Sequence, residues 1–316
     1  MGGDSKKNTT QFDVVVLGGL NTDFLVQGES LPKPGDTIQG DSFFCGPGGK
    51  GMNQAVAAAR LGARVALIGK VGQDRRGHEL RETLRREKVL SRTISIDRRT
   101  PTGCALVMVD RDGEKQILAY AGANANLSVA DVKRARHSLE NCQVLLTQFE
   151  APLPAIAAAA RMAKHAGARV VLDPAPPVRD LPRGLWQWID LVRPNAGEAE
   201  ALTGVRVRDR ASARRAGRAL LKCGVELAIV SIGHGGDLMV WNDGELFLPW
   251  FKVKSVDATG AGDAFAAALA VALAEGRARE DAGRFASATA ALATTRIGAQ
   301  SALPTRRQVE RLLAVS

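Results

Sequence analysis

The stretch from Val256 to Phe265 reads VDATGAGDAF. Two glycines end a polar lead-in, and Asp263 then opens an apolar run, Ala264 to Ala274, that predicts a buried helix. A small-residue turn before a helix leaves backbone N–H groups pointing outward, and the helix dipole adds positive potential there. Such a place binds anions, phosphate above all. A carboxylate there can accept a proton from an attacking hydroxyl while the amides stabilise a moving phosphoryl group.

Two interpretations of this stretch are open on its own residues. In the first, Asp263 is an ordinary first-turn acid, because Asp is common near helix starts. In the second, Gly260, Ala261 and Gly262 form an anion hole beside a general base. The run before the turn, Phe251 to Val256, is strand-like, so we expect a strand there. The rest of the chain bears on the choice.

The composition is that of an ordinary globular protein. The chain has 316 residues, of which 45% are hydrophobic, 24% charged and only 4% aromatic, so the core must be largely aliphatic. The net charge of +10 is scattered over helix-like segments, which favours a solvated surface over a nucleic-acid-binding patch. The four cysteines lie far apart and indicate neither a zinc site nor a disulfide framework.

No targeting or membrane segment is expected. Residues 1–11 are polar and lack an apolar core, so we expect a flexible tail rather than a signal peptide. No uninterrupted apolar stretch reaches 18 residues, so no membrane span is expected. Together with the unpaired cysteines, these features favour a cytoplasmic location.

The N-terminal region carries candidate sugar ligands. Phe12 to Leu17 predicts a buried strand, and Asn21 and Asp23 follow two residues apart, so both point to one face of an extended segment. An amide and a carboxylate on one face suit the vicinal hydroxyls of a sugar; a polar strand end is the alternative. The loop GPGGKGMN at residues 46–53 then adds Lys50 and Asn53 as donors before a helix predicted over 54–61.

The same loop raises a dinucleotide-binding alternative. Gly46, Gly48 and Gly51 fit G-x-G-x-x-G, the fingerprint of nicotinamide-cofactor folds. The segment before it is short and mixed rather than a buried strand, which disfavours that assignment. Gly51 stands where a Walker A loop needs Ser or Thr. An oxidoreductase therefore stays open only as a second function class.

Two strand patterns predict the fold class. From residue 129 onward, helical and strand patterns alternate regularly. This predicts a doubly wound, mostly parallel α/β sheet flanked by helices, within a single domain over 12–316. Short strand-like pieces drawn from about 22–45 and 93–121 predict a small β-sheet lid that covers the site and excludes water.

Polar residues gather at the expected carboxyl ends of the strands, where ligands collect in such sheets. Glu150, Asp173 and Ser231 each follow a predicted strand, and Ser231 begins the glycine-rich sequence SIGHGG. Asn195 and Glu198 lie three apart at a helix start, which is a normal capping arrangement. The same two side chains alternatively organise water around a magnesium ion.

Taken together, these segments resemble the ribokinase branch of the PfkB carbohydrate kinase family. The resemblance runs from Phe12 to the last helix, with the motifs GGKGMNQA at 48–55, NAGE at 195–198 and DATGAGD at 257–263. It implies a ribokinase-like fold and ATP-dependent phosphorylation of a sugar primary hydroxyl, O5 in the case of ribose. The alternative within the family is a kinase for 2-deoxyribose, another sugar or a nucleoside.

The resemblance also implies residue roles. Asp263 would be the general base, and Gly260, Ala261 and Gly262 would supply the anion-hole amides. The residues that would hold the sugar are Asn21, Asp23, Gly48, Gly49, Lys50, Asn53, Glu150 and Asp263. Those that would contact ATP are Asn195, Ser231, Gly233, His234, Gly235, Gly236, Gly262 and Ser287.

Metal ions and assembly follow from the same resemblance. Asn195 and Glu198 would act on Mg²⁺ indirectly. A monovalent cation, usually K⁺, would bind beside the anion hole, at positions matching Asp257, Thr259, Ala293, Arg296 and Gly298. A further family ligand is often a serine where Ala302 stands here, and this departure removes one hydroxyl from that set. The expected partners are ATP, a small sugar and a second copy of the chain bound through the lid, without nucleic acid or membrane.

Overall fold

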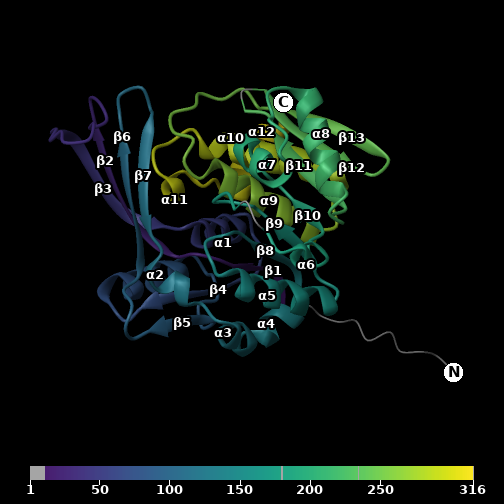
Figure 1. The fold of residues 1–316 in the computed structure, drawn as a ribbon, viewed down its shortest axis with the longest axis horizontal. Helices are drawn as coiled ribbons and strands as arrows, with labels where there is room; N and C mark the ends of the chain where they lie inside the picture. Colours follow the sequence, from purple (N-terminus) through teal and green to yellow (C-terminus); the bar gives the residue numbers. More distant parts are fainter. Residues whose placement is uncertain (1–10, 179–180, 234, 316) are drawn as a thin grey trace.

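The computed structural model describes residues 11–178, 181–233 and 235–315, and shows an α/β body with a small sheet standing at its side (Figure 1). Residues 1–10, most of the tail that the sequence predicts, lie outside the described residues, as does His234. In the parts of the chain that are described, no helix combines the length and apolar character needed to cross a bilayer.

The body is built on one large sheet. Its strands are β1 (Phe12–Leu17), β4 (Val65–Gly72), β5 (Ile94–Asp97), β8 (Cys142–Thr147), β9 (Arg169–Leu172), β10 (Leu191–Val192), β11 (Leu227–Ser231), β12 (Gly236–Trp241) and β13 (Gly244–Pro249). They run in the order β13-β12-β11-β10-β9-β8-β1-β4-β5. All pairs are parallel except β11–β12 and β12–β13. The predicted mostly parallel sheet is confirmed.

Helices cover both faces of this sheet. One face packs against α1 (Lys50–Arg60), α2 (Arg75–Arg86), α9 (Ala261–Ala274), α10 (Arg279–Ala293) and α12 (Arg306–Ala314). The other packs against α3 (Val129–Arg134), α4 (Arg136–Glu140), α5 (Leu153–His165), α6 (Arg183–Trp186), α7 (Ala196–Thr203) and α8 (Arg210–Leu221). Because side chains alternate along a strand, Val14 and Val16 join the first core while Val15 and Leu17 join the second.

A second sheet contains β2 (Asn21–Gly28), β3 (Gly40–Gly48), β6 (Gly103–Val109) and β7 (Lys115–Tyr120), in the order β3-β2-β6-β7. The expectation that lid strands begin at residue 93 is wrong for β5. That strand pairs in parallel with β4 at the edge of the large sheet, where Ile94 is buried in the core. A short apolar pattern does not reveal which sheet a strand joins.

Several expected element boundaries also change. Phe251–Val256 is irregular rather than a strand, because the N–H groups of Val256 and Asp257 donate to the carbonyl of Thr294 instead of a neighbouring strand (2.7 and 3.0 Å). The helix expected from residue 54 starts four residues earlier, at Lys50, and α9 starts at Ala261. The chain between β7 and β8 holds a 3₁₀ turn, η1 (Gly122–Asn126), and two helices where the sequence predicts one.

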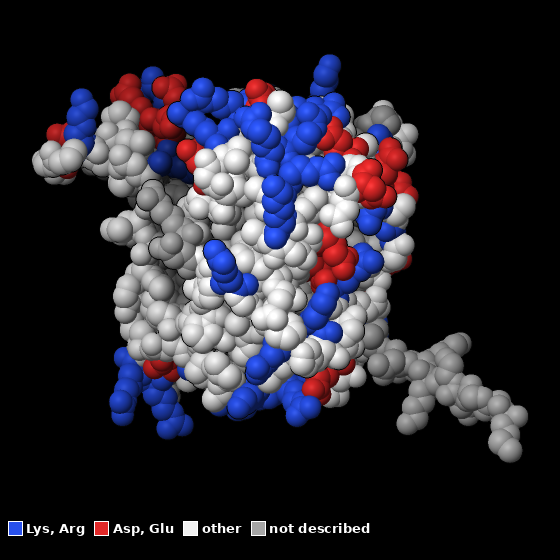
Figure 2. Space-filling model, turned by 45° about the vertical axis from the view of Figure 1, so that its right-hand side comes forward, with Lys and Arg blue, Asp and Glu red and all other residues white. Residues whose placement is uncertain are grey.

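Charged side chains spread over the surface as the sequence suggests. On the face drawn in Figure 2, Lys and Arg gather most densely in the upper part, with Asp and Glu among them, and the middle is largely uncharged. Several surface cations of the protein are paired: Arg210 and Arg214 both contact Glu245, and Arg306 contacts Glu275. Pairs of this kind belong to a solvated surface.

Candidate active site

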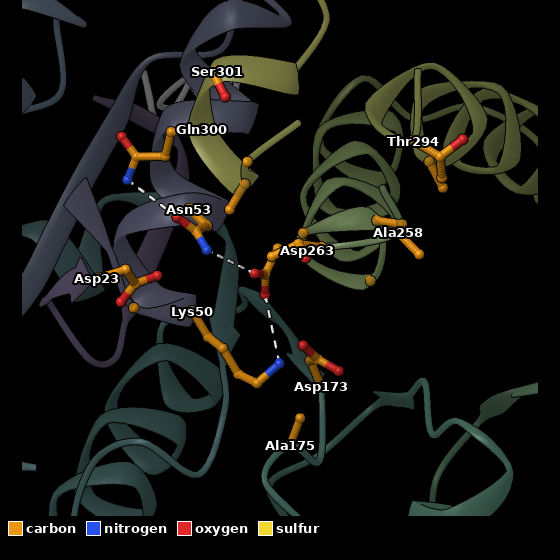
Figure 3. A pocket seen from close by; sticks show the side chains of 18 of the residues that line it. Asp23, Lys50, Asn53, Asp173, Ala175, Ala258, Asp263, Thr294, Gln300 and Ser301 are labelled. Atoms are coloured by element: carbon orange, nitrogen blue, oxygen red, sulfur yellow. Dashed lines mark hydrogen bonds and ion pairs between the residues drawn. The ribbon is translucent and has the colours of Figure 1, made fainter. Parts of the chain in front are cut away.

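A cavity of about 1010 Å³ lies where the two sheets meet. Its walls are the inner face of the small sheet, the first turns of α1 and α9, and the carboxyl ends of the parallel strands. Figure 3 shows side chains from these elements converging, with Asp23 and Lys50 on one side of Asp263 and Asp173 below it. This is the edge at which α/β sheets of this kind bind ligands.

Glycines allow the two helices to start at the cavity. Gly260 precedes α9 with φ 82°, and Gly49 precedes α1 with φ 86°. Positive φ values of this size favour glycine. A Cβ on Gly49 would also stand 2.7 Å from the carbonyl oxygen of Gly19. The two turns therefore bring Lys50 and Asp263 to the same cavity although they are far apart in the sequence.

Asp263 is buried and held by donors from α1. Asn53 Nδ2 donates to its Oδ2 (3.0 Å) and Gln54 Nε2 to its Oδ1 (3.1 Å). The ammonium of Lys50 lies 4.0 Å from Oδ1. Gln54 Nε2 also donates to Asp173 (2.8 Å), so one amide joins two buried carboxylates. These contacts fix the orientation of the Asp263 carboxylate that the sequence proposes as a base.

Two further amides orient the donors themselves. Gln148 Nε2 donates to Gln54 Oε1 (2.5 Å), and Gln300 Nε2 donates to Asn53 Oδ1 (3.1 Å). Each bond occupies the amide oxygen and so turns the amide nitrogen towards a carboxylate. Gln300 comes from the short helix α11 (Ala299–Ala302). Sequence reasoning assigned no role to these glutamines; only Gln54, which follows Asn53 in a quoted motif, carried a local signal.

The charged groups in the cavity perturb one another. Burial alone would lower the pKa of Lys50, but the carboxylates of Asp263, Asp173 and Glu150 outweigh it and raise that pKa, so Lys50 stays protonated. Burial raises the pKa of Glu150 to about 7 and that of Asp173 to about 7, with Lys50 opposing both. Burial and the nearby charge of Asp263 raise the pKa of Asp23 to about 6. Such shifts are common at functional sites.

The sugar-side residues that the sequence proposes mostly come together. Asn21, Asp23, Gly49, Lys50, Asn53, Glu150 and Asp263 all line the cavity. Gly48 does not line it; a Cβ there would stand 2.0 Å from the Asp23 carboxylate, so Gly48 makes room for that side chain. Asn21 Oδ1 already accepts a bond from Asn124 (2.9 Å), whereas Asp23 Oδ1 is buried and has no partner within the described chain.

The proposed anion hole is only partly free. Gly260, Ala261 and Gly262 line the cavity, but the N–H of Ala261 donates to the carbonyl of Ala258 (3.2 Å). The N–H groups of Gly262 and Asp263 lie in the first helical turn, where helices offer no internal acceptor. Lys115 from β7 reaches across to this turn, with its ammonium 3.3 Å from Thr259 Oγ1, a contact that the sequence did not suggest.

The proposed nucleotide-side residues divide into two groups. Asn195, Ser231, Gly262 and Ser287 line the cavity, whereas Gly233, Gly235 and Gly236 do not. The capping interpretation of Asn195 is confirmed: Asn195 and Glu198 form a capping box, and each carboxylate oxygen of Glu198 accepts a bond from Asn195 (both 2.8 Å). Glu198 also lines the cavity.

Four of the positions expected around a monovalent cation lie on two adjacent loops, and the fifth, Ala293, is the last residue of α10. Asp257 joins them, because its carboxylate accepts from Thr259 N–H (2.9 Å), from the Thr259 hydroxyl (2.6 Å) and from Gly298 N–H (2.9 Å). Burial raises the pKa of Asp257, but these hydrogen bonds outweigh it and lower that pKa overall. Thr259 and Gly298 line the cavity, whereas Asp257, Ala293 and Arg296 do not. No cluster of three or more His, Cys, Asp or Glu suited to a metal occurs among the described residues.

The dinucleotide alternative does not fit the fold. Gly46 and Gly48 lie in β3, which pairs antiparallel with β2 in the small sheet. The fingerprint instead requires a turn between a parallel strand and its helix, where the pyrophosphate sits on the helix N-terminus. Gly51 is already inside α1. The match to G-x-G-x-x-G is therefore incidental.

Comparison with known proteins identifies the family to which this chain belongs. The pfkB family carbohydrate kinases match residues 11–306. A ribokinase of Haemophilus influenzae is 37% identical over 295 residues, covering 93% of this chain and 96% of that protein. A deoxyribokinase of Salmonella typhi is 34% identical over 304 residues, covering 96% and 99%. The structure of Arabidopsis thaliana ribokinase complexed with ribose and ATP has a TM-score of 0.87 at 32% identity, covering 96% of this chain and 99% of that one. The chain therefore belongs to the pfkB family of carbohydrate kinases and is a sugar kinase.

Proposed function

We propose that this kinase transfers the γ-phosphoryl group of ATP to O5 of D-ribose, with Asp263 as general base. The observation that carries the proposal is the position of Asp263. Its carboxylate is held by Asn53 and Gln54 at the first turn of α9, in one cavity that is also lined by Asn21, Asp23, Asn195 and Ser231. A similar ribokinase was solved with ribose and ATP.

The transfer requires little covalent chemistry from the protein. Asp263 takes the proton of the sugar hydroxyl as the oxygen–phosphorus bond forms and the bond between the γ-phosphorus and its bridging oxygen breaks, releasing ADP. The N–H groups of Gly262 and Asp263 and the dipole of α9 stabilise the negative charge on the moving phosphoryl group. Magnesium, when bound with the nucleotide, would supply further charge neutralisation, and Glu198 and Asn195, which line the cavity, would hold its water ligands.

The environment of Asp23 favours a sugar substrate with two neighbouring hydroxyls. Its Oδ1 is buried without a partner in the described chain, and a buried carboxylate oxygen needs a donor. A sugar hydroxyl at the small sheet supplies one. Because a deoxyribokinase is also similar to this chain, 2-deoxyribose is the second candidate, and one pocket contact is enough to change such a preference.

An ATP-consumption screen over ribose, 2-deoxyribose, fructose and nucleosides tests the substrate. We expect the highest kcat/KM for ribose, and Asp23→Asn should lower it more for ribose than for 2-deoxyribose if the lost contact is to O2. A higher kcat/KM for 2-deoxyribose or for a nucleoside would replace ribose as the substrate. Absence of turnover with every sugar would refute the proposal.

Potassium activation is part of the same proposal. The loops at residues 257–259 and 296–298 are joined through Asp257, beside the Gly260 turn, and offer hard oxygen donors. Ala302 contributes no hydroxyl, and it is buried. A cation here would hold the two loops together and so support the first turn of α9.

We further propose a homodimer through the outer face of the small sheet. Asn21, Asp23 and Leu25 face the cavity, so the alternate residues of these strands face away from it. On that face the apolar side chains of Val26, Phe43, Leu106, Leu118 and Tyr120 are all exposed, Leu118 by 70%. Contiguous apolar surface of this kind marks an interface. Light scattering should give twice the chain mass, and Leu118→Lys should lower it towards one chain; an unchanged mass in the variant argues against this face.

A further inference from the structure

Arg193 occupies a place in the cavity that neither sequence motif nor proposed sugar contact explains. It follows β10 directly and lines the cavity wall, and its side chain is only 12% exposed. Its guanidinium lies over the ring of Phe265 in α9, 4.5 Å from the centroid. Nη1 stands 3.2 Å from the position that a Cβ on Gly262 would take. The guanidinium is therefore beside the first turn of α9.

The charge of Arg193 is poorly balanced within the protein. Among the described residues its one ion pair is with Asp237, and the Nη2–Oδ1 distance is long at 3.4 Å. Its Nε is buried and has no hydrogen-bond partner within the described chain. A guanidinium carries five N–H donors, and burying such a cation without full pairing is costly. An anion that enters the cavity would satisfy the remaining donors.

The position of Arg193 in the cavity indicates which kind of anion it binds. Asn195 and Ser231, the proposed nucleotide contacts, line the same cavity as Arg193. The ammonium of Lys50 instead pairs with Asp263 (4.0 Å), and the backbone N–H of Lys50 donates to Glu150 (2.8 Å). The planar guanidinium fork matches phosphate oxygens better than an ammonium does. The acidic residues Asp23, Glu150, Asp173, Glu198, Asp237 and Asp263 also line the cavity, so a polyphosphate gains from a fixed cation near the α9 turn.

We propose that Arg193 is a catalytic residue that donates hydrogen bonds to the β–γ end of the nucleotide and to the phosphoryl group during transfer. The proposal rests on the proposed function for the identity of the reaction. The proposal adds an arginine, supplied by the same chain, that lies beside Gly262 at the first turn of α9. Arg193 forms no covalent bond in this reaction and contributes positive charge and hydrogen bonds to the phosphate oxygens.

Binding of ATP, ADP, AMP and adenosine by calorimetry tests the phosphate contact without turnover. In Arg193→Met we expect ATP affinity to fall about tenfold while adenosine affinity stays unchanged, because only the polyphosphate contact is lost. Kinetics should then show kcat reduced about 100-fold, the cost of removing one transition-state donor, and Arg193→Lys should recover part of it.

Two controls separate this role from a structural one. Arg210→Met removes another guanidinium that lies over a phenylalanine ring, that of Phe247 (5.3 Å), but outside the cavity; it should leave binding and kcat unchanged. The second control compares the double variant Arg193→Met, Asp237→Asn with the single variant Asp237→Asn. In this comparison the buried Asp237 carboxylate is never left without its partner. The loss of ATP affinity should persist in that comparison.

The outcomes are distinguishable. Equal ATP affinity in Arg193→Met and wild type, or equal losses for ATP and adenosine with a lowered Tm, would overturn the phosphate role and leave Arg193 structural. Absence of sugar turnover by the wild-type enzyme would instead refute the proposed function. A selective loss of ATP and ADP affinity would still support the phosphate contact in that case.

Discussion

Replacement of Asp173 by Asn should stabilise this protein, and do so more at high pH than at low pH. Asp173 is 3% exposed, and burial raises its pKa to about 7. Asparagine keeps an oxygen that can accept the hydrogen bond from Gln54 (2.8 Å) but removes the buried charge. The variant is therefore close in shape and differs mainly in electrostatics.

The direction of the stability change with pH follows from how many protons the folded and unfolded chains bind. Between about pH 4 and pH 7 folded Asp173 is protonated while the unfolded chain, with a carboxyl pKa of 3.8, is ionised, so wild-type stability falls as pH rises through this window. At 1.36 kcal/mol per pKa unit, the two units between pH 5 and a folded pKa of about 7 give an upper limit of about 3 kcal/mol. The variant lacks this loss. The carboxyl groups of Asp23 and Glu150 also titrate in this pH range. Both groups are present in the wild type and in the variant, so their contributions to the stability difference largely cancel.

Thermal unfolding of both proteins at pH 5 and pH 8 measures the effect. We expect the Tm of Asp173→Asn to exceed that of wild type by roughly 5 °C more at pH 8 than at pH 5. Asp209→Asn is the control, because the Ser212 hydrogen bonds lower the pKa of this exposed carboxyl and it is ionised at both pH values; its Tm difference should not change between them. A Tm difference for Asp173→Asn that is the same at both pH values would refute the reasoning.

Three further predictions concern catalysis. Asp263→Asn should bind ATP and ribose nearly as wild type does and lose about 1000-fold in kcat; near-normal kcat would exclude the base role. Turnover should be faster in potassium than in sodium chloride at equal ionic strength, and identical rates would count against the cation site. Gln300→Ala frees the amide of Asn53, which is 3.1 Å from Gln300 Nε2, and should lower kcat about tenfold, more than it raises the KM for ribose. If only KM for ribose changes, Gln300 does not position the base.

Much of this protein was accessible from local sequence, because the determining interactions are local. The Val-rich strand at 12–17 and the alternation after residue 129 predicted the parallel sheet, and glycine before an apolar run predicted the helix α9, although this helix begins at Ala261 rather than at Ala264. The capping box of Asn195 and Glu198 also depends on residues three apart. Patterns of this range reflect the periods of helix and strand.

The tertiary structure alone decided which side chains meet. The bond from Gln54 to Asp263 spans 209 residues, and that from Gln300 to Asn53 spans 247. Arg193 is not part of the NAGE motif that begins at Asn195, and only the tertiary structure places its guanidinium beside Gly262 and over the ring of Phe265. β5 likewise joined the large sheet because β4 offered a parallel edge. Burial of charge in a shared cavity depends on contacts between distant segments, and these contacts have no local period in the chain.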